Sequence, residues 1–104
     1  MKVIQELSEM IEEEIEGAEE YAKGAVHFKE SNPTLAKTFY DISVDEVKHI
    51  GLLHEEVKKL IEAHRKEHGE PPAAMIAVYD YLHKKHMEKV SHIKVMQGEY
   101  RSVP

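Results

Sequence analysis

The sequence predicts an all-α protein, from the spacing of its apolar residues and the positions of its helix-breaking residues. Apolar side chains recur three and four residues apart, and Val, Ile, Phe and Tyr do not alternate with polar residues at period two. Proline and glycine interrupt this pattern in SNPT, residues 31–34, and in EHGEPP, residues 67–72. The predicted fold is an antiparallel helical hairpin plus a third helix in one domain, residues 1–104, with helices at about 3–30, 33–68 and 72–98.

The composition excludes several classes of protein and site. The chain has no cysteine, so any metal must be held by oxygen and nitrogen ligands. Its net charge of −6 argues against nucleic acid as the main partner, because phosphate binding needs clustered positive charge. No apolar stretch is long enough for a signal peptide or a membrane span. We therefore expect a cytoplasmic protein with neither a nucleic-acid nor a membrane partner.

The first predicted helix has an apolar stripe that contains one carboxylate. The stripe positions are spaced four and three residues apart, as in a helix of an antiparallel bundle. They are Leu7, Ile11, Glu14, Ala18, Tyr21, Ala25 and Phe28. Glu14 therefore stands where the pattern asks for an apolar side chain, although a lone polar residue on such a stripe is more often a satisfied core group than a ligand.

Asn32 is the predicted N-cap of the second helix, and Pro33 is its first residue. Its apolar stripe is interrupted by Glu46 and His49, which lie three residues apart and therefore share one face. The apolar members of the stripe are Leu35, Phe39, Ile42, Leu53, Val57 and Leu60. Three polar residues on two facing stripes are harder to attribute to chance than one.

Helix geometry predicts that these polar residues meet. At about 1.5 Å per residue, Glu14 lies roughly 24 Å before the end of the first helix and Glu46 roughly 20 Å after the start of the second. A short connection makes the helices antiparallel, so both carboxylates fall at the same height. Two buried carboxylates in contact cost several kcal/mol unless one is protonated or a cation lies between them. A divalent metal is the simplest way to satisfy Glu14, Glu46 and His49 together.

The chain resembles the ferritin-like di-iron carboxylate superfamily, which includes rubrerythrins, bacterioferritins and encapsulated ferritins. The motifs that carry the resemblance are EIEGAEEY, in which Tyr21 follows Glu14 by seven residues, and DEVKH, with Glu46 and His49. The resemblance implies that Glu14 is a terminal or bridging ligand, Glu46 a bridging carboxylate, His49 a terminal ligand, and Tyr21 a hydrogen-bond partner of the ligands. It also implies two irons, with manganese or zinc as other metals that suit these donors, and a ferroxidase-type enzyme that oxidises or sequesters ferrous iron.

A complete site of this family needs four ligand-bearing helices, and this chain has one pair plus a third helix without Glu-x-x-His. Short members of the family pair two chains, each of which supplies half of the ligands. The resemblance therefore implies a homodimer, or an assembly of dimers, in which dimerisation completes a four-helix bundle.

The third predicted helix offers one further candidate pair. The height that matches His49 is near residue 91, where Glu88 and His92 lie four residues apart on one face. These two residues would complete a site within one chain, but the flanking lysines fit a solvated face equally well. The apolar positions of this helix are Met75, Val78, Tyr79, Leu82, Val90, Ile93 and Met96.

Other histidines receive no predicted role. His27 and His54 fall off the apolar stripes. His83 and His86 bracket two lysines, and we expect these two histidines to face solvent in part. His86 also falls where the apolar stripe of the third helix would continue.

A second function stays open from the residues alone. In it the chain is a metal-free helical bundle with an interaction or structural role, and Glu14, Glu46 and His49 form a buried hydrogen-bonded cluster that specifies helix register. The helical pattern is also similar to that of small proteins of unknown function from bacterial and phage genomes.

Overall fold

The structure is a computed structural model that describes residues 2–103. It contains three α-helices, and no strand occurs among the described residues: α1 (Lys2–Phe28), α2 (Pro33–His68) and α3 (Ala73–Arg101). The prediction of an all-α fold is confirmed. The first helix ends at Phe28 rather than near residue 30, and the third continues to Arg101 rather than ending near residue 98.

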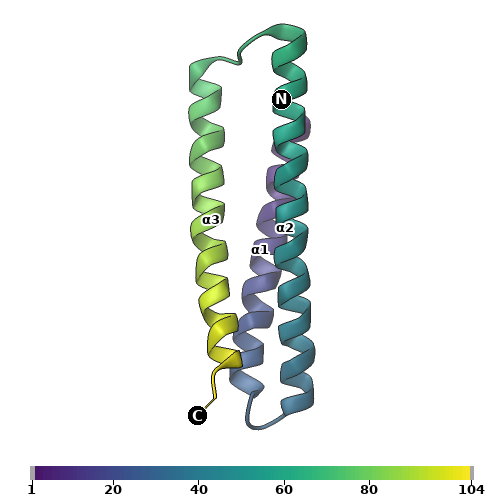
Figure 1. Ribbon diagram of the computed structural model, residues 1–104, viewed down its shortest axis with the longest axis vertical. Helices are drawn as coiled ribbons and strands as arrows, with labels where there is room; N and C mark the ends of the chain where they lie inside the picture. Colours follow the sequence, from purple (N-terminus) through teal and green to yellow (C-terminus); the bar gives the residue numbers. More distant parts are fainter. Residues whose placement is uncertain (1, 104) are drawn as a thin grey trace.

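The helices form an elongated bundle with extents of 56 × 18 × 17 Å (Figure 1). Each helix runs antiparallel to the one before it, so α1 and α3 point in the same direction. Helix α1 packs closely against α2 and also contacts α3, whereas α2 and α3 contact each other sparsely. Between residues 2 and 103, no helix is both long enough and apolar enough to cross a membrane.

The two turns follow from local chemistry that the sequence displays. The side chain of Asn32 accepts a hydrogen bond from the Leu35 amide at 3.2 Å, which caps the first turn of α2. Gly69 ends α2 with φ at 78°, and its amide donates to the Arg65 carbonyl at 2.9 Å. A glycine adopts this backbone conformation at little steric cost.

The buried stripe of α1 differs from the predicted one. Its fully buried residues are Ile4, Ile11, Ile15, Ala18, Ala22 and Ala25. Leu7, Glu14, Tyr21 and Phe28 are only half-buried, so the prediction that they belong to the buried stripe was wrong. Because α1 packs against both α2 and α3, its buried face is centred between these two helices, and positions 14, 21 and 28 lie at the edge that α3 leaves uncovered.

A buried polar chain ties the three helices together. The Ser43 hydroxyl on α2 donates to the carbonyl of Ala18 on α1 at 2.8 Å, and the Gln97 amide on α3 donates to the Ser43 oxygen at 2.9 Å. Ser43 and Gln97 are both buried. These two hydrogen bonds satisfy the buried polar groups and fix the relative heights of the three helices.

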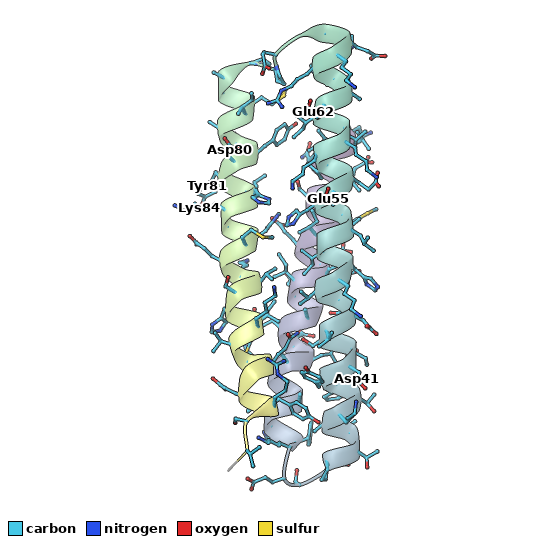
Figure 2. The ribbon with its side chains drawn as sticks, viewed as in Figure 1. Asp41, Glu55, Glu62, Asp80, Tyr81 and Lys84 are labelled. Carbon is cyan, nitrogen blue, oxygen red and sulfur yellow. The ribbon has the colours of Figure 1, made fainter. Side chains whose placement is uncertain are left out.

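Helix α3 is attached more firmly near its C-terminal end than near its start. At the C-terminal end the rings of Tyr40 and Tyr100 stack with centroids 4.7 Å apart, and Arg101 donates to the Tyr40 hydroxyl at 2.8 Å. Nearer the start of α3, Tyr81 is 65% exposed and points away from α2 (Figure 2).

Candidate functional site

The three predicted ligand residues lie on one face formed by α1 and α2. Glu14 comes from α1, and Glu46 and His49 come from adjacent turns of α2. His49 Nδ1 is 3.4 Å from Glu14 Oε2. This distance is longer than a normal N–H···O hydrogen bond, so neither group is firmly committed to the other.

Burial and charge both act on Glu46. Burial raises the pKa of its carboxyl above the usual value, and the negative charge of nearby Glu14 raises it further, whereas His49 has the opposite, smaller effect. Glu46 and Glu14 are therefore close enough to repel when both are ionised. A bound cation would relieve this repulsion and the loss of hydration together.

The Glu46 carboxylate lies in a space that depends on a glycine. A Cβ atom on Gly17 of α1 would be 2.5 Å from Glu46 Oε2 and 3.0 Å from Oε1. Within the described part of the chain, the buried Oε2 atom has no hydrogen-bond partner. A glycine inside a helix costs about 1 kcal/mol relative to alanine, and here it admits a carboxylate oxygen that accepts no hydrogen bond from the described residues. Sequence reasoning missed Gly17, although the residue stands in the middle of EIEGAEEY.

Tyr21 belongs to an aromatic cluster on the same face. Its ring meets that of Phe39 edge to face with centroids 5.3 Å apart, and Phe39 meets Phe28 at 5.9 Å. A second glycine, Gly24, leaves space for the Phe39 ring, because a Cβ atom on Gly24 would lie 2.5 Å from that ring. Among residues 2–103, no hydrogen bond joins the Tyr21 hydroxyl to Glu14, Glu46 or His49. The role of Tyr21 at the ligands stays a prediction.

The face that carries Glu14 and His49 is open and partly apolar. A shallow pocket is lined by Met10, Glu13, Glu14, His49, Leu52 and Leu53. Met10 is 51% exposed and Leu52 is 66% exposed, so this face presents apolar surface beside charged groups.

Glu88 and His92 lie away from this face. Both are exposed on α3. The pKa of Glu19 is lowered by its hydrogen bond with Lys23 and, to a smaller extent, by nearby His92. Glu19 is five residues from Glu14 and therefore lies roughly 140° around α1 from it. The structure thus does not bring Glu88 and His92 to the predicted ligands.

A second group of histidines was missed by the sequence analysis. His54 and His86 are 9% and 2% exposed, so the expectations that His54 falls off the packed face and that His86 faces solvent were wrong. His83 is exposed, as expected. His54 Nε2 is 3.5 Å from His86 Nδ1, between α2 and α3. The two residues are 32 positions apart, so no local sequence pattern pairs them. The pair becomes visible only when α3 is packed against the α1–α2 hairpin.

Neither group is a finished metal centre within one chain. Among residues 2–103, no three or more His, Asp or Glu side chains converge in a way that would hold a metal ion. The chain matches no protein-family model, and comparison with curated proteins and with solved structures likewise finds no match.

Proposed function

We propose that this chain is a ferritin-like protein in which two copies form a homodimer, or a unit of a larger assembly of dimers, and bind two irons between their α1–α2 faces. The iron is oxidised or sequestered there. The observation that carries the proposal is the Glu46 carboxylate, which is placed beside Glu14 and His49 in the space left by Gly17 with one buried oxygen unpartnered.

The available donors fit iron. Carboxylate oxygen and imidazole nitrogen suit iron, manganese and zinc, and iron is the metal that the resemblance implies. Glu46 Oε2 accepts no hydrogen bond from the described residues, so its lone pairs are available to a cation. The 3.4 Å separation of His49 Nδ1 and Glu14 Oε2 leaves both atoms available as well.

One chain supplies half of the ligand set of a di-iron centre. A two-fold axis through the α1–α2 face would bring together two copies of Glu14, Glu46 and His49, which amount to four carboxylates and two imidazoles. This is the donor set that four-helix di-iron proteins assemble from four helices. An incomplete set on each chain accords with the lack of a complete centre among the described residues.

The surroundings of the three residues support a second copy as the occupant of this face. Apolar side chains flank the carboxylates, with Met10 and Leu52 at least half exposed. Burial of such residues by an identical surface provides the hydrophobic contribution to dimerisation.

Each residue has a defined role in the proposal. Glu46 would hold iron as a carboxylate, with the bridging role that the resemblance implies, because a cation would offset the burial and the negative charge of Glu14, which both raise its pKa. Glu14 and His49 would be the further ligands, and the negative charge of the carboxylates would compensate that of the cations. Bound iron supplies the one-electron redox chemistry, with dioxygen or peroxide as the electron acceptor.

The metal-free alternative receives less support from the contacts. It requires Glu14, Glu46 and His49 to satisfy one another by hydrogen bonds. Glu14 and His49 approach each other only to 3.4 Å, and Glu46 Oε2 has no partner among residues 2–103. The helix register is also already fixed elsewhere by Ser43 and Gln97.

Anaerobic titration with ferrous iron tests the proposal. We expect protein prepared without a histidine tag to bind about one iron per chain, and Glu46→Gln to lose this binding while it stays folded. Glu88→Gln is the matched control, because Glu88 is an exposed glutamate outside the site. Equal iron binding by all three proteins would refute the proposed site.

A further inference from the structure

A pair of buried histidines joins the two helices that otherwise contact each other least. We propose that His54 of α2 and His86 of α3 bind one transition-metal ion of the Zn²⁺, Co²⁺ or Ni²⁺ class, with His83 as a third ligand. This site is separate from the α1–α2 face, and the bound metal would hold α3 against the hairpin of α1 and α2.

The spacing of the ring nitrogens suits a shared cation. His54 Nε2 and His86 Nδ1 are 3.5 Å apart. Two nitrogens that each bind zinc at about 2.0–2.1 Å in tetrahedral geometry are separated by about 3.3–3.4 Å. A hydrogen bond between the same nitrogens would bring them to about 3 Å. The observed separation is longer than a normal hydrogen bond and within reach of the metal-bridged value.

The far side of His86 is arranged as in a metal-binding histidine. His86 Nε2 is buried and has no hydrogen-bond partner among the described residues, and it faces Glu12 Oε1 of α1 at 3.6 Å. At 3.6 Å the carboxylate is too far to accept a hydrogen bond from Nε2, but a small movement of the half-exposed Glu12 side chain would bring it within reach and leave Nδ1 as the acceptor that faces His54. Histidine ligands commonly donate their second ring N–H to a carboxylate in this way.

The surroundings of His54 and His86 disfavour a charged imidazole ring. Burial lowers its pKa to about 4, and the neighbours His83, His86 and Lys58 also act to lower it, whereas Glu55 acts in the opposite direction. Burial also lowers the pKa of His86, against the effect of Glu12. Burial therefore acts against a charged ring at either position, and the neutral imidazole is the form that binds metals.

His83 completes the set after a change of side-chain rotamer. Its ring centroid is 4.9 Å from that of His54, and it precedes His86 by three residues on α3. Three donors do not yet converge among residues 2–103, but exposed side chains change rotamer readily. The three histidines, together with Tyr79 and Asp80, line a pocket of about 200 Å³. This pocket has room for a water molecule as the fourth ligand of the metal.

The proposed site would attach α3 to α2, which the few contacts between these two helices do not do firmly. Direct contacts between α2 and α3 are few. Tyr81 and Lys84 point outward from α3 (Figure 2), and His86 lies roughly 140–200° around the helix from them, on the side that faces the bundle. A metal held by both helices would therefore stabilise the part of α3 that Tyr40, Tyr100 and Arg101 do not secure.

Cobalt binding tests this proposal in tag-free protein stripped with EDTA. The experiment uses the Glu46→Gln background, so that the α1–α2 face does not contribute. We expect one Co²⁺ per chain with the visible absorption of a tetrahedral ion. His54→Gln and His86→Gln should weaken binding at least about 100-fold, and Glu12→Gln should weaken it about 10- to 100-fold.

Two controls separate this site from adventitious binding. His64 and His68 form an exposed or half-exposed pair with ring centroids 5.0 Å apart, so His68→Gln removes the most plausible competing site. His92→Gln removes an exposed histidine of α3. Both variants should bind Co²⁺ as the parent does. Loss of binding in His68→Gln, or its retention in both His54→Gln and His86→Gln, would overturn the proposal.

A measurement on the parent protein covers the case in which the variants fail to fold. Nitrogen NMR of the histidine rings should show that Zn²⁺ shifts Nε2 of His54 and Nδ1 of His86 and leaves His92 unchanged. A spectrum in which Zn²⁺ leaves His54 and His86 unchanged would equally overturn the proposal.

Discussion

Gly17 and Glu46 fit together so closely that a single methyl group on Gly17 would meet the Glu46 carboxylate. A Cβ atom at residue 17 would lie only 2.5 Å from Glu46 Oε2. Because Gly17 of α1 has no side chain, the Glu46 carboxylate of α2 can lie against it. This carboxylate is the centre of the proposed metal site.

Gly17→Ala should separate metal binding from fold stability. Alanine favours the helix by about 1 kcal/mol, and the flexible Glu46 side chain can swing toward solvent, so we expect apo stability to be kept or increased. Iron affinity should fall by at least about 10-fold because the bridging carboxylate is displaced. Urea unfolding and ferrous titration measure the two effects.

Gly51→Ala is the control for this substitution. Gly51 is also helical, and a Cβ atom there meets nothing within 4 Å. It should bring the same gain in helix stability with unchanged iron affinity. If the two alanine variants bind iron equally well, the space at Gly17 does not position a ligand.

Glu46→Gln should stabilise the metal-free protein at neutral pH. The folded pKa of Glu46 is raised, so the ionised carboxylate opposes folding once the pH rises above the unfolded value near 4.5. The neutral amide removes this cost, and we expect a gain on the order of 1 kcal/mol at pH 7.5 that vanishes near pH 4. Urea unfolding at the two pH values in EDTA measures it, and a loss of stability at pH 7.5 would mean that the ionised carboxylate is favourably partnered.

Leu52→Glu should disrupt the proposed dimer. Leu52 is 66% exposed beside His49, and a charge there would be buried by a second copy at considerable cost. Light scattering should show a shift of the Leu52→Glu protein toward the monomer. Val95→Glu is the control, since Val95 is 59% exposed on α3. Dissociation by Val95→Glu alone would place the dimer interface on α3.

Acid should destabilise the metal-free protein through His54. Its unfolded pKa is near 6.5 and its folded pKa is about 4, so the unfolded chain takes up the proton first. Stability contributed by neutral His54 is present above pH 6.5 and is lost as the pH falls toward 4, by at most about 3 kcal/mol. Unfolding in EDTA between pH 7.5 and 4.5 should show this loss in the parent protein, and His54→Leu should show a shallower dependence. Equal slopes for both proteins would contradict the burial of a neutral imidazole.

The helices and turns were predictable because their signals are local. Asn32 followed by Pro33 begins α2, and Gly69 ends it, through hydrogen bonds within a few residues of each other. The antiparallel hairpin also led us to expect Glu14 opposite the second helix, and it lies 3.4 Å from His49.

The rotation of the buried faces and the histidine pair were not predictable in this way. Spacing alone does not distinguish a stripe centred on Glu14 from one centred on Ile15, because the answer depends on where α3 packs. The approach of His54 to His86 depends on the same packing across 32 residues of sequence. Gly17, in contrast, was visible as a costly residue in a helix interior, and its meaning required the position of Glu46.

Native mass spectrometry of tag-free protein loaded anaerobically with ferrous iron is the strongest test of a dimeric iron site, because it counts chains and metals in the same particle. We expect dimers, or multiples of dimers, that carry about two irons per pair of chains, and iron-free dimers for Glu46→Gln. A monomer, or a dimer that carries the same iron with and without the Glu46 carboxylate, would contradict this proposal.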